Sequence, residues 1–172
     1  MTRIAQLQVS YSALEDRLLL RLSTDNRLEF RFWVTQRYLK LLQPVLTEIV
    51  ESSGRAAMIP DQATRKTVTE FERETALVGA DFQTEFNEAA ASLPLGEAPV
   101  LLARIQKKVS PTGSPVLCLH PQSGMGVEVV LDPQLLHSLI SLLSNGAIQA
   151  DWGAAQNDGG QPLAAGESRV LN

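Results

Sequence analysis

The feature that most constrains the fold is a pattern of polar and apolar residues that occurs twice, at an offset of 97 positions (Thr35 to Asp132, 132 − 35 = 97). Each copy has short segments of alternating polarity, typical of strands with one buried face, followed by apolar residues every three or four positions, typical of an amphipathic helix. At this offset apolar residues meet apolar residues without a gap: Leu20 and Leu117, Leu22 and Leu119, Phe30 and Val127, Phe32 and Val129, Val34 and Leu131, Leu39 and Leu136, Leu42 and Leu139, Leu46 and Leu143. The pattern predicts two duplicated β-β-β-α halves. Any hairpin and helix of matching lengths would agree in the same way, so both explanations stay open.

In the first half, three strands are predicted over Ile4 to Tyr11, Arg17 to Ser23 and Arg27 to Val34. Turn-forming residues between the second and third of these predict a hairpin. Thr35 is suited to cap a following helix, which Pro44 should kink.

The second half repeats this order. Strands are predicted from Val100, over Pro115 to His120 and over Gly126 to Leu131. Asp132 is expected to cap a helix that begins with a proline and ends at Gly146, because proline suits a first helical position and glycine a helix end.

A long helix is predicted between the halves, from Asp61 to Ala91, although Gly79 could break it. One side of this helix would carry an acidic stripe formed by Glu70, Glu74, Asp81, Glu85 and Glu88. The expected fold is α+β with an antiparallel sheet, divided into a first half (1–54), a linking amphipathic helix (61–92), a second half (98–150) and a flexible tail (151–172). In that tail Trp152, Val170 and Leu171 are the residues that could anchor it to a partner.

Composition places the chain among ordinary globular proteins, with 172 residues, 44% of them hydrophobic and 20% charged. One cysteine, no apolar run of membrane-spanning length and no signal-like start favour a cytoplasmic protein without a membrane partner. The net charge is −4, and the charges are unevenly distributed along the chain. Residues 1–40 include seven basic and four acidic residues (+3), residues 41–100 include four basic and ten acidic residues (−6), and the remaining residues include four basic and five acidic residues (−1).

Motifs for catalysis, cofactors and metals are not found in the sequence. Cys118 and His120 form a Cys-x-His pair, but a zinc site needs three or four ligands at regular spacing, so a buried cysteine is the expected role. The acidic stripe lacks the histidine that carboxylate di-metal sites use. Neither a GxSxG nucleophile motif nor a phosphate-binding glycine motif occurs. No cofactor and no metal are therefore predicted, and an enzyme with a site hidden in the fold is the third hypothesis for function.

A basic and aromatic strand face gives the second hypothesis. Alternation places several arginines and one tryptophan on the polar face of the hairpin, and the second half could extend that face: Arg17, Arg21, Arg27, Arg31, Trp33, Arg104 and Lys108. Guanidinium groups for phosphates and an aromatic ring for base stacking are what a single-stranded nucleic-acid platform requires. The alternative is that the acidic stripe lies across this face and neutralises it.

The repeated order of strands and helix resembles the Whirly and transcriptional-coactivator fold that binds single-stranded DNA. The resemblance covers Ile4 to Gly146 and concerns architecture, with three strands in each half instead of four and no lysine-glycine-lysine motif. It implies a twisted antiparallel sheet with helices related by a pseudo-twofold axis, and single-stranded DNA as a ligand.

The first hypothesis is a non-enzymatic protein that binds a macromolecular partner or forms a homo-oligomer. Its basis is the predicted linking helix, which has apolar and aromatic residues at helical spacing and could pack against a copy of itself.

Overall fold

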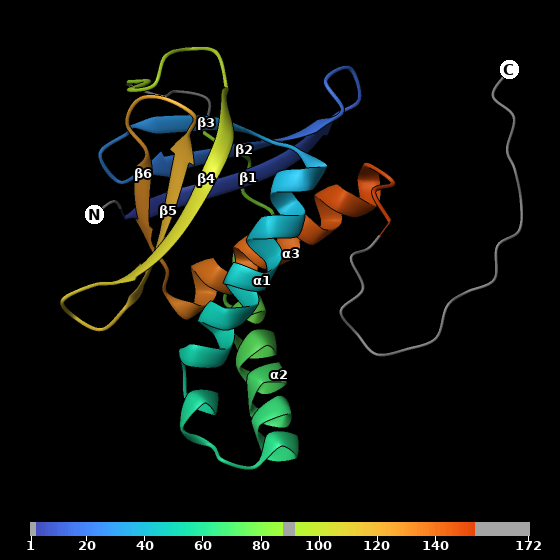
Figure 1. Ribbon diagram of the computed structural model, residues 1–172, viewed down its shortest axis with the longest axis vertical. Coiled ribbons are helices and arrows are strands. Elements are labelled where there is room, and N and C mark those ends of the chain that lie inside the picture. The colour runs from blue at the N-terminus through green and yellow to red at the C-terminus, as the bar shows by residue number, and fades with distance from the viewer. Residues whose placement is uncertain (1–2, 88–91, 154–172) are drawn as a thin grey trace, which may run out of the picture.

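The alternating segments form a single sheet with helices on one side, as seen in the computed structural model, which describes residues 3–87 and 92–153 (Figure 1). The fold is α+β, as predicted. In chain order the described elements are β1 (Ile4–Ser12), β2 (Arg17–Thr24), β3 (Glu29–Val34), α1 (Gln36–Ser52), the short 3₁₀ helix η1 (Ala56–Met58), α2 (Gln62–Val78), β4 (Val100–Val109), β5 (Pro115–Pro121), β6 (Val127–Val130) and α3 (Pro133–Gln149).

The sheet is mixed, and this corrects the prediction of an antiparallel sheet. Its strands lie in the order β1-β2-β3-β4-β5-β6, antiparallel within each group of three, while β3 and β4 run parallel, with Phe32 beside Val100. Helices α1 and α2 separate these two strands in the chain, and a crossover of that length can return the chain in the parallel direction, which a tight hairpin cannot. The element order is three strands and a helix on both sides of α2, and whether the two groups superpose stays a prediction.

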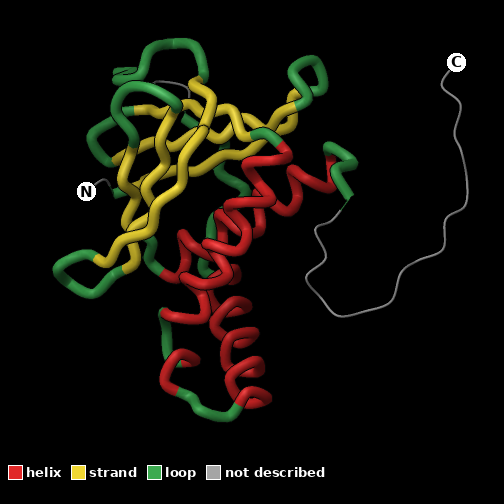
Figure 2. The backbone as a smooth tube through the Cα atoms, viewed as in Figure 1, coloured by secondary structure: helices red, strands yellow, loops and turns green. Residues whose placement is uncertain are grey.

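The core lies between the sheet and helices α1 and α3 (Figure 2). All nine residues for which the sequence predicts a core position are buried: Leu20, Phe30, Phe32, Leu39, Leu42, Leu117, Val129, Leu136 and Leu139. Both predicted caps are confirmed, because Thr35 accepts a hydrogen bond from the amide of Tyr38 at 3.1 Å and Asp132 accepts one from Leu135 at 2.7 Å. Such caps satisfy amides that the first helical turn leaves unpaired.

Helix α3 is longer than predicted, since it continues past Gly146 to Gln149. Gly146 is buried, and a Cβ atom at this position would come within 3.0 Å of the side chain of Leu18. The glycine therefore allows α3 to approach β2 closely, which is a packing role and not the helix-ending role that the sequence suggested.

The linking helix is shorter than predicted, because α2 ends at Val78 and Gly79 is its C-cap. Beyond it, Asp81 accepts hydrogen bonds from the amides of Gln83 at 2.9 Å and Thr84 at 3.0 Å. This local bonding competes with helical hydrogen bonds. The acidic stripe is consequently not one helical surface: Asp81 and Glu85 lie in the non-helical segment 79–87, here called the strap, and Glu88 lies outside the described residues.

Trp152, which the sequence predicts to lie in the flexible tail, is packed against the folded part of the chain. Trp152 packs edge-on against Tyr11, with ring centroids 6.3 Å apart, and its indole N–H donates to Asp16 at 3.2 Å. Its carbonyl accepts from Gln36 at 3.0 Å, so this residue joins the start of α1 to the β1–β2 turn. The rest of the predicted tail, including Val170 and Leu171, lies outside the described residues.

Helix α2 extends away from the sheet beside the end of α1, and its packing partners are α3 and η1 (Figure 1). Glu72 accepts from the amide of Arg55 at 2.8 Å, and Arg65 donates to the carbonyl of Ile59 at 2.9 and 2.7 Å. Polar contacts thus fix α2 to the turn before it. Over residues 3–87 and 92–153, no helix combines the length and apolar character needed to cross a membrane.

Candidate interaction surfaces

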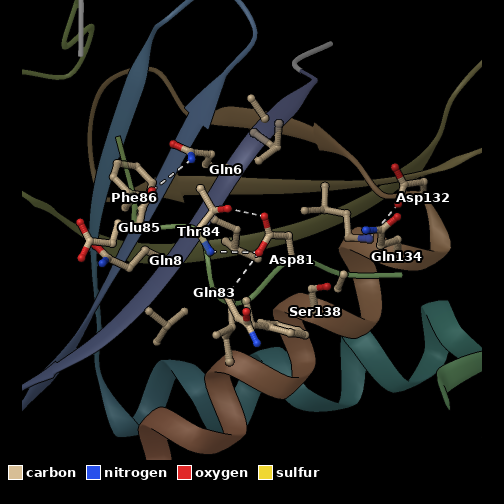
Figure 3. Close-up of a pocket in the computed structure, with 18 of the residues that line it drawn as sticks. Gln6, Gln8, Asp81, Gln83, Thr84, Glu85, Phe86, Asp132, Gln134 and Ser138 are labelled. Atoms are coloured by element: carbon tan, nitrogen blue, oxygen red, sulfur yellow. Dashed lines mark hydrogen bonds between the residues drawn. The ribbon is translucent and has the colours of Figure 1, made fainter. Parts of the chain in front are cut away.

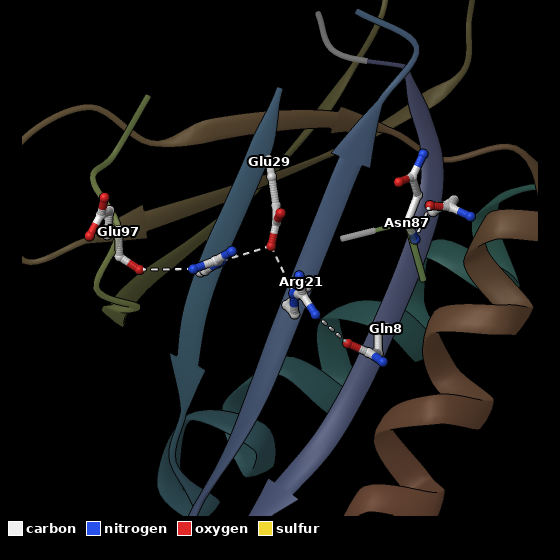
Figure 4. Close-up of polar contacts among 7 residues, drawn as sticks. Gln8, Arg21, Glu29, Asn87 and Glu97 are labelled. Atoms are coloured by element: carbon white, nitrogen blue, oxygen red, sulfur yellow. Dashed lines mark hydrogen bonds and ion pairs between the residues drawn. The ribbon is translucent and has the colours of Figure 1, made fainter. Parts of the chain in front are cut away.

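Two of the predicted nucleic-acid-binding arginines are joined by a buried glutamate. Arg21 and Arg31 are register neighbours on β2 and β3, and the Nε atom of each donates to the same oxygen of Glu29 at 2.7 Å (Figure 4). The Glu29 side chain is 1% exposed, that of Arg21 9% and that of Arg31 26%. We refer to these three residues as the arginine–glutamate cluster.

The carboxylate of this cluster is held in its charged form. Burial acts to raise the pKa of Glu29, but hydrogen bonds from Arg31 and Arg21 outweigh burial and hold that pKa below its usual value. Glu29 is therefore ionised at neutral pH. Its second oxygen is buried and has no hydrogen-bond partner within the described parts of the chain. One carboxylate thus compensates half of the charge that the two arginines bring to this end of the face.

The strap covers the same end of the face. The ring of Phe86 lies 4.2 Å from the guanidinium carbon of Arg21, a cation–π geometry, and Arg21 also donates to Gln8 at 3.1 Å. Arg31 donates to the carbonyl of Glu97 at 3.2 Å. Among the described residues, an aromatic ring and a backbone carbonyl contact these two arginines, while Asp81 binds amides of its own segment. Glu88 lies outside the described residues, so the alternative in which the acidic stripe covers this face stays a prediction.

The other predicted site residues are spread over the same side of the sheet. Trp33 is half-buried in a cross-strand row between Leu19 and Leu101. The Nη1 atom of Arg17 lies 3.7 Å from Oε2 of Glu15, and Lys108 forms an ion pair with Glu128 on β6. Arg27 and Arg104 are exposed in the turn before β3 and on β4. The structure therefore brings Arg21 and Arg31 together and places Arg17 and Lys108 beside acids.

A cavity of about 560 Å³ lies at the open edge of β1, between that strand, the strap and the start of α3 (Figure 3). Its charged lining residues are three acids, Asp81, Glu85 and Asp132, and one base, Arg3. Hydrogen bonding to Thr84 is the main reason that the pKa of Asp81 lies below its usual value. Sequence patterns could not reveal this cavity, because its walls come from three segments far apart in the chain.

An exposed apolar face on α2 is the third candidate. Phe71 is 66% exposed and Val78 is 88% exposed, and none of the 17 residues of this helix is buried. Phe71 and Val78 are seven residues apart and so lie on the same side of the helix. Three threonines, Thr64, Thr67 and Thr75, share this side, which we call the α2 face. Phe71 and Val78 lie two turns apart on this uncharged side of the helix, with Thr75 between them.

The cysteine and histidines do not form a metal site. Within residues 3–87 and 92–153, no group of three or more histidine, cysteine or acidic side chains could hold a metal ion. Cys118 is buried, as predicted, and burial raises the pKa of its thiol. His137 is buried on α3, where burial is the main reason that its pKa is lowered, with a smaller contribution from Arg73 on α2. These properties are those of packed residues.

Comparisons with known proteins give no relative. No family model matches the chain, and neither a curated protein nor a solved structure matches it.

Proposed function

We propose that the chain is a non-enzymatic cytoplasmic protein that forms a homodimer through the α2 face. The observation that carries this proposal is the exposure of Phe71 and Val78 on a helix with no buried residue. Seventeen-residue helices are marginal in water without tertiary packing, and within residues 3–87 and 92–153 the main packing partners of α2 are α3 and η1. A second copy would give the α2 face a partner.

The spacing of the α2 face suits a twofold contact. Its positions, Thr64, Thr67, Phe71, Thr75 and Val78, are symmetric about Phe71, because 64 + 78, 67 + 75 and 71 + 71 all equal 142. Two antiparallel copies would therefore place Phe71 against Phe71 and Thr64 against Val78 of the other copy. A self-complementary surface of this kind is what a twofold dimer requires.

Charge also favours this arrangement. The α2 face itself carries no charge, so antiparallel pairing brings no like charges into its centre.

Light scattering coupled to gel filtration tests the proposal. Wild type should show a mass of twice 18.8 kDa, about 38 kDa, at micromolar concentration. Phe71→Glu should dissociate into monomers, because pairing would bury two carboxylates against each other. Leu14→Glu is the matched control, since Leu14 is 95% exposed in the β1–β2 turn. A monomeric wild type, or a dimer that Phe71→Glu leaves intact, would rule out this interface.

Single-stranded nucleic-acid binding is a second proposal, favoured by the half-buried Trp33 on the outer side of the sheet and by exposed Arg104 on β4. Fluorescence anisotropy with a labelled oligonucleotide tests it. Each arginine that contacts a phosphate should contribute about −0.7 to the slope of log affinity against log salt. Trp33→Ala should weaken binding by about 1 to 3 kcal/mol without changing that slope. A lack of affinity at physiological salt would refute this proposal and leave the dimer proposal untouched.

We also infer that the two β-β-β-α halves are duplicates. Corresponding apolar residues of the two halves are separated by a constant 97 positions, and each half has a side-chain helix cap at the equivalent position, Thr35 or Asp132. Both observations support this inference. In a crystal structure, superposition of the two halves should place Phe30 on Val127 beneath equivalent helices. A mismatch at these positions would mean that the halves share only a pattern of polar and apolar residues and are not duplicates.

A further inference from the structure

Strand β1 lies at one edge of the sheet. Its neighbour in the strand order is β2 alone, so half of the amides and carbonyls along Ile4–Ser12 point away from the sheet. Proline, lysine, inward-pointing charges or bulges usually protect such an edge, because an unprotected edge pairs with other chains. The nine residues of β1 include no proline and no charged residue, and its one irregularity in register lies between Ile4 and Gln6.

The strap covers this edge. At its start, the carbonyl of Gly79 accepts a hydrogen bond of 2.7 Å from Gln134 in the first turn of α3, on the helix side of the sheet. Further along, the side chain of Gln6 on β1 donates to the carbonyl of Glu85 at 3.5 Å and accepts from the amide of Asn87 at 2.9 Å. The strap therefore runs from α3 to β1 and lies alongside the strand there (Figure 3).

The end of the strap reaches the opposite face of the sheet. The ring of Phe86 lies 4.2 Å from the guanidinium carbon of Arg21, which is the register partner of Gln8 on β1. The strap thus passes around β1 near Gln6, from the helix side of the sheet to the outer face. A seventh strand would have to occupy the same space, so the docked strap prevents pairing at this edge.

The strap itself is weakly held. Seven of its nine residues are exposed, and the other two, Ala80 and Phe86, are partly buried. Asp81 bonds amides within the strap, which shapes the segment without attaching it to the sheet. Segments with little buried surface open at a lower free energy than the whole fold. The strap should therefore detach without unfolding of the sheet.

Strand β1 does not need the strap to keep its shape. Its register with β2 extends from Ile4 to Ser12, and the side chains of Leu7, Val9 and Tyr11 pack against the core. When the strap detaches, β1 therefore remains an extended strand with hydrogen-bonding groups exposed along its edge.

We propose that the strap is an autoinhibitory cover: while docked it blocks the edge of β1, and when it detaches β1 pairs antiparallel with β1 of a second copy. A second copy is the partner that this edge fits, because two identical uncharged strands place no like charges opposite each other. An antiparallel pair of identical strands also has the twofold symmetry of a closed dimer. The edge is separate from the α2 face, and the inference does not rest on the α2 dimer.

Loosening the strap without changing β1 tests the proposal. All variants carry Phe71→Glu, which removes any contribution of the α2 face. Phe86→Ala and Gln134→Ala together remove a cation–π contact and a hydrogen bond, which should raise the detached fraction about 10-fold. Because both copies must be open, this rise lowers the apparent dissociation constant of the β1 pair about 100-fold. Sedimentation velocity from micromolar to millimolar concentration measures this constant, and Leu14→Ala with Gln149→Ala, both exposed outside the strap, is the control.

A lysine on β1 identifies the edge. Ser10→Lys, added to the loosened variant, places on the strand a charge of the kind that protects natural edges, so it should reverse the gain in association. Hydrogen exchange gives independent evidence. In the concentrated loosened variant, the outward-pointing amides within Ile4–Ser12 should exchange more slowly than in a dilute sample, since each becomes part of a strand pair.

Three results would overturn the proposal. The first is a loosened variant that stays monomeric to millimolar concentration while thermal melting shows a native fold. The second is association that Ser10→Lys leaves unchanged, or that leaves the amides of β1 unprotected. The third is association of Phe71→Glu alone as strong as that of the loosened variant, since the strap would then block nothing. If Phe86→Ala destabilises the fold, Gln134→Ala alone replaces the pair of changes, with an expected gain of about 10-fold.

Discussion

Removing the charge of Glu29 should be one of the most destabilising single changes in the chain. In Glu29→Gln the side chain keeps its shape, but Arg21, whose side chain is 9% exposed, loses the carboxylate that compensates its charge. Breaking a buried ion pair by removing one partner costs about 3 to 5 kcal/mol. Arg31 is 26% exposed and can be rehydrated, so a value near the lower limit, about 3 kcal/mol, is expected.

Urea unfolding followed by circular dichroism measures this loss. With a slope of about 2 kcal/mol per molar urea, the midpoint should fall by about 1.5 M. The control is Glu48→Gln, which breaks an exposed ion pair with Lys107 and should cost less than about 1 kcal/mol. If Glu29→Gln is no more destabilising than this control, the arginine–glutamate cluster does not stabilise the sheet as described.

The same cluster predicts a dependence on pH. Because the folded pKa of Glu29 lies below its unfolded value, the stabilisation is complete above the unfolded pKa and is lost as pH falls through the folded pKa. Between neutral pH and pH 3 the wild type should therefore lose more stability than Glu29→Gln, which has no carboxylate to protonate. Parallel curves for the two proteins would contradict the assigned pKa direction.

Three further changes test the packing. Leu136→Ala should cost about 2 to 5 kcal/mol in urea unfolding, because Leu136 is buried where α3 meets the sheet, and a loss below 1 kcal/mol would refute that position. His137 has a lowered folded pKa, so its contribution to stability should decline as pH falls below about 6.5 and should be absent in His137→Gln, as melts across pH 5 to 8 can show. Gly126→Ala should destabilise the protein, since its Cβ would overlap the ring of His120, whereas Gly79→Ala, whose Cβ has no neighbour closer than 3.7 Å, should be neutral or stabilising by up to about 1 kcal/mol. Equal melting temperatures for these two glycine variants would contradict the packing around β5.

Local patterns predicted the elements well because local physics determines them. Period-two alternation placed the strands and five of the nine predicted core residues, and spacings of three and four placed the other four on α1 and α3. Thr35 and Asp132 were recognisable caps because a side-chain oxygen there meets an amide three residues later. Gly146 was misinterpreted because a glycine that ends a helix and a glycine that permits close packing are identical in sequence. Only the neighbouring Leu18 distinguishes them.

Long-range relations were beyond the sequence. The parallel pairing of β3 with β4 depends on the path of a crossover, and nothing in either strand specifies it. Alternation correctly placed Arg21 and Arg31 on the polar face, together with Glu29. Polarity alone could not show that Glu29 would be buried between them or that Phe86 would cover Arg21. The sequence could not predict the cavity beside β1 either, because three segments that are distant in the chain form its walls.

Disulfide trapping tests the central claim, that α2 pairs with α2 of a second copy in antiparallel register about Phe71. In that register, position 71 of one copy lies opposite position 71 of the other. Position 64 of one copy lies opposite position 78 of the other, and about 21 Å along the helix axis from position 64 of the other. A disulfide requires Cα atoms within about 7 Å. Phe71→Cys should therefore form covalent dimers under mild oxidation. Thr64→Cys and Val78→Cys should each form no covalent dimer alone and should cross-link when mixed, while the buried native Cys118 takes no part. Cross-linking of Thr64→Cys with itself, or no cross-linking of Phe71→Cys, would contradict the proposed dimer.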